Sequence, residues 1–207
     1  MQDEESAIQF AGCQIILRDW RQDDLGIHRY WAAPDHQWQQ LDAPYYAKPT
    51  PEETEAFIAK AQAAIDAAHW PQLRRRLVIA DEQNAYIGQV SWYWISEETY
   101  WPAVGIVIYD PAHWGQGKGY EALGLWSDYL LKAEPKFARL DLRTWSGNHG
   151  MMRLAEKLGY QLEARFRNAR IVNDAYFDGL GYGVLREEWF SRYPQGFAAQ
   201  LAKPDQC

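Results

Sequence analysis

The stretch Trp114-Gly-Gln-Gly-Lys-Gly-Tyr-Glu-Ala122 decides the fold of this chain, because it joins a strand-like run to a helical pattern. Three glycines at alternate positions let the backbone turn tightly and approach a ligand closely. The N–H groups of such a turn and the partial positive charge of the helix N-terminus favour an anion such as a pyrophosphate. Taken alone, the stretch is equally compatible with an ordinary glycine-rich turn between a strand and a helix.

Two nucleotide-binding motifs with similar glycines do not match this stretch. A P-loop requires Gly-Lys followed by Ser or Thr, whereas Gly117-Lys118 is followed by Gly119. The dinucleotide fingerprint requires a third glycine where the chain has Tyr120. The stretch therefore predicts an anion-binding turn of another kind.

The composition fits one globular domain. The chain has 207 residues, 47% of them hydrophobic, which is enough to build a single core. We expect one domain over residues 1–207, with 1–11 and 195–207 as peripheral tails. A formal charge of −7 argues against nucleic-acid binding and weakly favours a cationic partner. No apolar run approaches the roughly 18 residues that a membrane span needs, and we expect no metal site.

Cysteine usage and the N-terminus indicate the compartment. Cys13 and Cys207 are too few for a disulfide scaffold, and the start Met1-Gln-Asp-Glu-Glu5 lacks the basic and apolar regions of a signal peptide. We therefore expect a cytoplasmic protein.

Hydrophobic periodicity predicts a mixed α/β (α+β) chain with the element order βααβββαβαββ. In the strand at 86–95, we expect Tyr86, Val90, Trp92 and Trp94 to share one face. An aromatic-rich connection at 31–46 has little periodicity and is typical of loops that shape pockets. The predicted strands lie at 13–18, 76–80, 86–95, 103–109, 139–144, 161–172 and 175–185, and the predicted helices at 23–31, 50–69, 119–135 and 148–159.

Two motifs carry a family resemblance. Val107-Ile-Tyr-Asp-Pro111 precedes Trp114-x-x-Gly117-x-Gly119, and Asn148 begins a helix that ends in Lys157-Leu-Gly-Tyr160. The chain resembles the GNAT N-acyltransferases and is most similar to the branch that includes the ribosomal-protein alanine N-acetyltransferases. The resemblance covers nearly the whole chain. It implies a mostly antiparallel sheet flanked by helices, with acetyl-CoA as co-substrate.

The resemblance also implies which residues bind acyl-CoA. The backbone of the strand would pair with the pantetheine arm, the glycine turn would hold the pyrophosphate, and Asn148 would hydrogen-bond to the cofactor. Asn148 could instead only cap its helix. The implied acyl-CoA residues are Val107, Ile108, Tyr109, Trp114, Gly115, Gln116, Gly117, Lys118, Gly119 and Asn148.

Proton-transfer residues are harder to identify. In relatives a Ser or Tyr serves as the acid at the positions that Met151 and Ala155 occupy here, and neither residue can give a proton. Arg143 and Ala103 stand where some relatives carry a Glu. The remaining candidates are Asp141, which could equally form a structural ion pair beside Arg143, and Glu98, which could be a solvated turn residue. We therefore expect catalysis to rely on positioning, with protons moving through water.

Four residues are candidates for binding the acceptor amine: Trp38, Trp92, Tyr176 and Asp178. A carboxylate near aromatic rings suits a cationic amine, although the final hairpin could simply pack the sheet edge. Arg165, Arg167 and Arg170 could meet acidic groups or form a solvated basic face.

The sequence thus predicts an acetyl-CoA-dependent N-acetyltransferase that acts on a small-molecule amine or a protein N-terminus by direct attack in a ternary complex. The alternative is a non-catalytic acyl-CoA-binding module. Its best support is that the acid and base residues of relatives are missing here. Exposed aromatic side chains could form a homodimer interface as well as a pocket.

Overall fold

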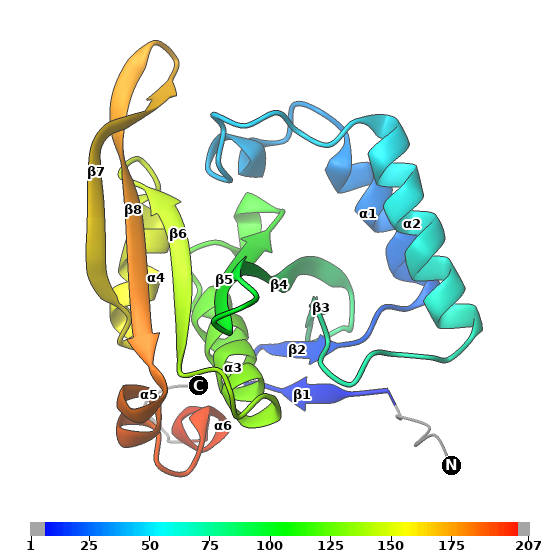
Figure 1. Ribbon diagram of the computed structural model, residues 1–207. Helices are drawn as coiled ribbons and strands as arrows, with labels where there is room; N and C mark the ends of the chain where they lie inside the picture. Colours follow the sequence, from blue (N-terminus) through cyan, green and yellow to red (C-terminus); the bar gives the residue numbers. More distant parts are fainter. Residues whose placement is uncertain (1–6, 203–207) are drawn as a thin grey trace.

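A computed structural model describes residues 7–202 as one eight-stranded sheet with helices on both faces (Figure 1). The strand order is β1-β2-β3-β4-β5-β6-β8-β7, and all pairs are antiparallel except β5 with β6. This confirms the predicted fold class. The strands are β1 (Gln9–Ala11), β2 (Ile15–Arg18), β3 (Arg76–Asp81), β4 (Tyr86–Ser96), β5 (Trp101–Ile108), β6 (Arg139–Trp145), β7 (Gln161–Val172) and β8 (Ala175–Leu185). The α-helices are α1 (Gln22–Ala32), α2 (Pro51–Asp66), α3 (Lys118–Ala133), α4 (His149–Leu158), α5 (Arg186–Arg192) and α6 (Phe197–Leu201), with short 3-10 turns at Gln37–Gln40 and Pro111–His113.

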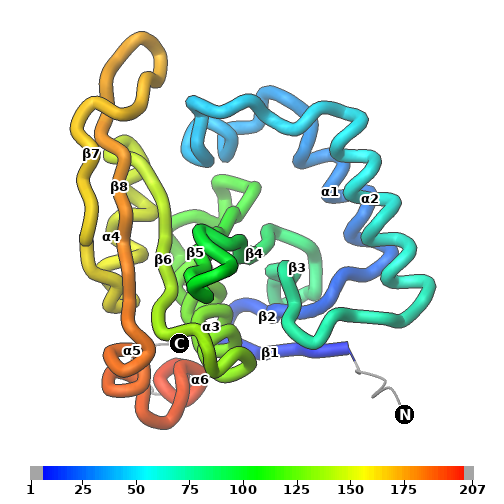
Figure 2. Tube along the Cα trace, viewed as in Figure 1, coloured from blue at the N-terminus to red at the C-terminus, as the bar shows by residue number. Residues whose placement is uncertain are grey.

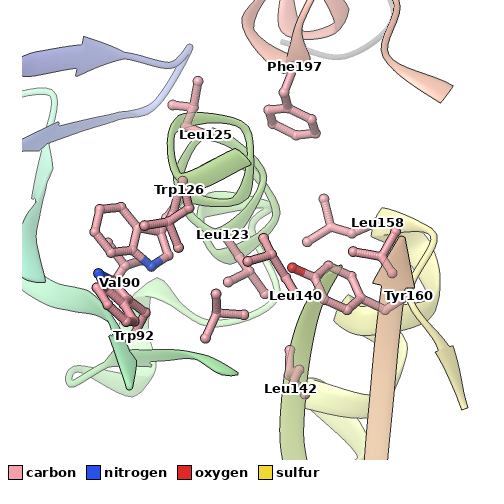
Figure 3. Close-up of a cluster of buried hydrophobic side chains, with 14 of the residues drawn as sticks. Val90, Trp92, Leu123, Leu125, Trp126, Leu140, Leu142, Leu158, Tyr160 and Phe197 are labelled. Atoms are coloured by element: carbon pink, nitrogen blue, oxygen red, sulfur yellow. The ribbon is translucent and has the colours of Figure 1, made fainter. Parts of the chain in front are cut away.

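Each face of the sheet has its own apolar cluster, because alternate strand residues point to opposite faces. Leu77 and Ile79 of β3 belong to the cluster that contains side chains of α3 and α4, whereas Val78 and Ala80 belong to the cluster that contains Leu25 of α1 and Ile58 of α2. Figure 3 shows the first cluster, in which Leu123 and Trp126 of α3 face Trp92 of β4 and Leu140 of β6. The sheet is therefore covered by α3 and α4 on one face and by α1 and α2 on the other.

A β-bulge in β4 changes which residues share a face. Gly88 pairs with Ile79 and Tyr86 with Ala80, so Ile87 is an extra residue in β4. Tyr86 consequently packs in the α1–α2 cluster, while Val90 and Trp92 pack against α3. The expected common face of Tyr86 with Val90, Trp92 and Trp94 is wrong for Tyr86, because simple alternation fails across a bulge.

The described ends of the chain belong to the fold, although both were expected to be peripheral. β1 pairs with β2, and Phe197 of α6 is fully buried against α3. A Cβ at Gly124 of α3 would lie 2.1 Å from the Phe197 ring, so this glycine permits the contact. The observed order therefore adds one strand before the predicted series and two helices after it.

The hairpin of β7 and β8 extends beyond the rest of the sheet, as the tube in Figure 2 shows. Its register shifts between Phe166 and Arg170, and Asn168 there has a φ of 54°. Asp178 of β8 accepts hydrogen bonds from the Asn168 N–H at 3.0 Å and from Arg165 at 3.1 Å. These contacts stabilise an irregular segment of the hairpin. This segment reaches toward residues 33–49, which connect α1 to α2.

Among the helices between residues 7 and 202, none has the length and apolar character needed to cross a bilayer.

Candidate functional site

The site begins where the parallel strands β5 and β6 separate. Ala103 pairs with Asp141 and Val104 with Leu142, and no further β5–β6 pair follows in the described chain. The next residues of β5 remain paired with β4 through Ile108. One edge of β5 from Gly105 onward is therefore open, and its backbone polar groups can pair with a ligand.

A cavity of about 340 Å³ lies along this edge and reaches the glycine turn; we call it the turn cavity. Seven of the ten predicted acyl-CoA residues line it: Val107, Ile108, Trp114, Gly115, Gly117, Gly119 and Asn148. Trp114 is fixed here because its indole N–H donates to the Ile108 carbonyl at 2.8 Å. The two sequence motifs, far apart in the chain, therefore meet at one cavity.

The other three predicted acyl-CoA residues do not line the turn cavity. Tyr109 is buried in the α1–α2 cluster, where desolvation raises the pKa of its phenol. Gln116 is exposed and donates to the Ala112 carbonyl, while the Lys118 ammonium lies 2.8 Å from Nδ1 of His113.

The glycine turn has the conformation that its sequence predicts. Gly115 and Gly117 have φ values of 73° and 89°, a region that other residues rarely adopt. Gly117 is the N-cap of α3, so the first N–H groups of that helix have no intrahelical acceptor. Apart from its two chain neighbours, no residue described by the structure has a heavy atom within 4 Å of the position a Cβ would take at Gly115. The turn therefore offers free donors beside open space, which fits a pyrophosphate.

Asn148 both caps α4 and positions the neighbouring connection. Its side-chain oxygen accepts from the Met151 N–H at 3.0 Å, and its amide donates to the Leu41 carbonyl at 3.1 Å. Trp145 donates to the same carbonyl at 3.0 Å. Two donors thus hold Leu41, and with it the adjacent Asp42, at the point where β5 and β6 separate.

A second cavity, of about 580 Å³, lies on the α1–α2 face of the sheet; we call it the large cavity. The β3–β5 register puts Arg76, Ser91 and Gly105 on that face, and Gln89 and Val107 beside them. The 42–46 connection and the irregular part of β7 supply its walls. A small cavity of about 80 Å³ lies in the separation between β5 and β6.

The turn cavity and the large cavity share Asp42, Ile106 and Val107. Asp42 also lines the small cavity. Its side chain stays open to solvent, but surrounding protein atoms desolvate it and raise its pKa, an effect that the nearby Lys48 partly opposes. The Lys48 ammonium also donates to the Asp42 carbonyl.

The sequence prediction missed Asp42 because it lies in a connection without periodicity. The available signal was small: Asp42 is one of only two acidic residues at positions 31–50.

The predicted catalytic carboxylates lie away from both cavities. The Asp141 side chain is only 5% exposed and pairs with Arg139 at 2.6 Å and Arg143 at 3.5 Å. Glu98 is exposed at the β4–β5 turn, where it accepts a hydrogen bond from Ser96 at 3.0 Å. The contacts of Asp141 are those of a structural ion pair, and those of Glu98 are local to its turn.

The structure does not bring the four predicted acceptor-binding residues to the large cavity. Trp38 lines the turn cavity instead. Trp92 is in the core, where its indole N–H donates to the Arg74 carbonyl at 2.9 Å. Tyr176 is 65% exposed on the hairpin, and Asp178 is engaged by Arg165. The aromatic residue of β4 that lines the large cavity is Tyr93, which lies between Trp92 and Trp94 in the sequence and on the opposite face of the strand.

Residues 14–161 match the family model of the acetyltransferase (GNAT) domain. The chain belongs to the GNAT acetyltransferase family. This confirms the family that the two motifs indicated, and acetyl-CoA is the co-substrate of GNAT acetyltransferases. The proposed similarity to the ribosomal-protein alanine branch stays a prediction.

One curated relative is an uncharacterised prophage-derived N-acetyltransferase, YokL, of Bacillus subtilis. It is 24% identical over 115 residues, which span 55% of this chain and 63% of the relative.

Two solved structures illustrate the similarity in fold. A GNAT-family acetyltransferase from Bacillus anthracis has a TM-score of 0.68 at 19% identity, over 87% of this chain and all of that chain. A spermidine N-acetyltransferase from Vibrio cholerae, in complex with CoA and spermine, has a TM-score of 0.67 at 19% identity, over 86% of this chain and 98% of that chain. At this identity the likeness shows the shared fold.

Proposed function

We propose that this chain transfers the acetyl group of acetyl-CoA to a primary amine by direct attack in a ternary complex. The observation that carries the proposal is the contact between two cavities at the separation of β5 and β6. The turn cavity holds the anion-binding turn, the large cavity lies on the α1–α2 face of the sheet, and Asp42, Ile106 and Val107 border both. Two substrates bound there would meet beside these residues, which is the geometry that direct transfer needs.

The turn cavity is the proposed donor site. When bound, acetyl-CoA supplies an acetyl thioester that an amine can attack. The N–H groups at 115–119 would hold its pyrophosphate, and the open edge of β5 at Val107 and Ile108 would pair with the amide groups of its pantetheine arm. Asn148 would act indirectly, because its amide already holds Leu41.

Asp42 is the proposed base. A primary amine is largely protonated near pH 7, yet only the neutral amine is a nucleophile, so a proton must leave it. Asp42 lies where the cavities meet, and desolvation by the surrounding protein atoms raises its pKa and so strengthens it as a proton acceptor. Met151 and Ala155 cannot return a proton to the leaving thiolate, so we assign that proton to water.

Release of free thiol from acetyl-CoA across a panel of primary amines tests this proposal. The panel includes small amines and peptides with a free N-terminus, and mass spectrometry of the product locates the acetyl group. Amine-dependent thiol release with an N-acetylated product is expected. Tight acetyl-CoA binding without turnover of any amine would instead favour the non-catalytic acyl-CoA-binding module.

Several further properties are part of the proposal. The chain acts as one domain over 1–207, in the cytoplasm, without nucleic acid or a membrane as partner. A homodimer is compatible with the exposed Leu162, Phe166 and Ile171 on the edge strand β7.

A further inference from the structure

The large cavity has an unusual charge for a protein with a formal charge of −7. Three arginines from three separate strands line it: Arg76 from β3, Arg143 from β6 and Arg170 from β7. Asp42 is the one acidic residue among its described lining residues. A second ammonium group on an acceptor, as in a polyamine, would therefore be repelled in this cavity, whereas an anionic group would be attracted.

Arg170 is held in place but is not neutralised. Its guanidinium carbon lies 4.5 Å from the centre of the Tyr45 ring and 5.5 Å from that of Tyr46. Its Nε is buried and has no hydrogen-bond partner within the described chain. No carboxylate between residues 7 and 202 lies within ion-pair distance of it. A buried donor without a partner is costly, so Arg170 points to an acceptor group on a ligand.

The other two arginines complete the cationic side of the cavity. Arg76 makes no ion pair with any described carboxylate, and its guanidinium lies 5.2 Å from the Phe57 ring. Arg143 contacts Asp141 at 3.5 Å, but Asp141 is already paired more closely with Arg139. Both guanidiniums therefore keep donors for a ligand, and planar guanidiniums match the oxygens of carboxylates and phosphates.

The same cavity also contains acceptors that suit an ammonium group. The Oε1 atom of Gln89 is buried without a hydrogen-bond partner in the described chain. Gln89 pairs with Val107 in the sheet, and Val107 borders the turn cavity. Gln89 and Asp42 thus offer oxygen atoms near the donor site. The cavity therefore has acceptors for an amine and separate donors for an anion.

We infer that the acceptor is a small primary amine that also carries an oxyanion, either a carboxylate or a phosphate-type group, and that Arg170 with Arg143 and Arg76 selects it. The inference rests on the proposed function and names the substrate class of the same site. The phosphates of acetyl-CoA do not account for these arginines, since none of the three lines the turn cavity. A volume of about 580 Å³ is in the range of small-molecule sites.

The test uses the full chain and four acceptor series with matched length: ω-amino carboxylates, aminoalkyl phosphonates, n-alkylamines and α,ω-diamines, together with the common α-amino acids. We expect kcat/KM for at least one oxyanion-bearing amine to exceed that of its alkylamine and diamine counterparts by about 10-fold or more. The carboxylate and phosphonate arms distinguish the two sources of negative charge. An alkylamine, a diamine or a peptide N-terminus without an acidic group as the best acceptor would overturn the inference.

Arg170→Gln and the control Arg167→Gln test whether Arg170 causes the preference for oxyanion-bearing amines. Arg167 is exposed on the same strand and lies outside the lining of the large cavity. Arg170→Gln should lower kcat/KM for the oxyanion-bearing amine by roughly 10- to 100-fold and leave the matched alkylamine within about 2-fold. Arg170→Lys should recover part of the loss, and Arg167→Gln should behave like the unmodified chain. Equal losses on charged and uncharged amines would contradict a selective role.

A binding measurement separates this inference from the proposed function. Isothermal titration of the same amines into the chain saturated with CoA does not depend on turnover. Binding of an oxyanion-bearing amine that Arg170→Gln weakens, without acetylation, would keep the inference and reject the acetyltransferase. Turnover of other amines, with no preference for an oxyanion in either assay, would keep the acetyltransferase and reject the inference.

Discussion

Asp42 and Val107 border both the turn cavity and the large cavity, although they come from an irregular connection and a central strand. Val107 is fixed by its pairing with Gln89 in the sheet. Asp42 is fixed through Leu41, whose carbonyl accepts from Trp145 and Asn148. The proposed base is therefore positioned by the β6–α4 segment, and not by its own connection alone.

Asp42→Asn should lower kcat by about 100- to 10,000-fold at neutral pH, the usual contribution of a positioned base. The carboxylate must be ionised to accept a proton, so the rate should rise with pH through its pKa, which desolvation by surrounding protein atoms raises and Lys48 partly lowers. The variant should lose this rise and still bind CoA. Asp35→Asn, in the same connection and exposed, is the matched control. An unchanged pH profile in Asp42→Asn would assign the base elsewhere.

Asp141→Asn should chiefly affect stability. Its buried carboxylate pairs with Arg139 at 2.6 Å, so the amide would remove one of the two carboxylates that pair with this partly buried guanidinium and leave only the more exposed Glu163. Because both arginine partners are partly exposed, we expect a loss of about 1–3 kcal/mol in the free energy of unfolding, measured in urea. Glu98→Gln, at an exposed turn, should leave the free energy of unfolding unchanged within error. A pH profile altered by Asp141→Asn at full stability would restore Asp141 as the base.

The donor half of the site was predictable because local rules determine it. Positive φ at Gly117 requires glycine, and the helix after Asn148 shows its apolar side at Met151, Leu154 and Leu158. These short patterns specify the backbone conformation within a few residues. Their resemblance to the motifs of the family then indicated acyl-CoA as the ligand.

The acceptor half could not be predicted in the same way, because it depends on contacts between distant segments. Trp92 and Tyr93 are adjacent aromatic residues, and only the packing of α3 decides that Trp92 is in the core. The bulge at Ile87 also breaks the alternation on which the prediction for Tyr86 relied. Arg170 reaches the cavity through an irregular segment of β7 that no periodicity indicates.

Gly117→Ala should weaken CoA binding. Its φ of 89° disfavours a side chain by roughly 1–2 kcal/mol, so the turn would shift and misplace the N–H groups at the start of α3. We expect the Kd for CoA to rise about 10-fold, equivalent to one weakened charge-assisted hydrogen bond. Gly26→Ala in α1 is the control, because outside its own helix backbone and chain neighbours no heavy atom of residues 7–202 lies within 4 Å of its added Cβ. Equal CoA affinity in folded Gly117→Ala would argue against pyrophosphate binding at this turn.

His28 should make the fold sensitive to mild acid. Burial, assisted by the nearby positive charge of Arg76, lowers the pKa of His28 from 6.5 to about 4. The folded state therefore holds the neutral ring, which lies 3.1 Å from the Tyr86 hydroxyl. Because the unfolded chain binds this proton more readily, the stabilisation is complete above pH 6.5 and is lost as the pH falls toward 4.

Urea unfolding at pH 7, 6, 5 and 4.5 measures this effect against His28→Gln, which does not titrate and can still bond to Tyr86. The unmodified chain should lose more stability than the variant across this range, by at most about 3 kcal/mol at a cost of about 1.4 kcal/mol per pH unit. His69→Gln, at an exposed position after α2, should show the same change of the free energy of unfolding with pH as the unmodified chain. If His28→Gln also shows that change, the ring is not held neutral by its burial against α2 and β4.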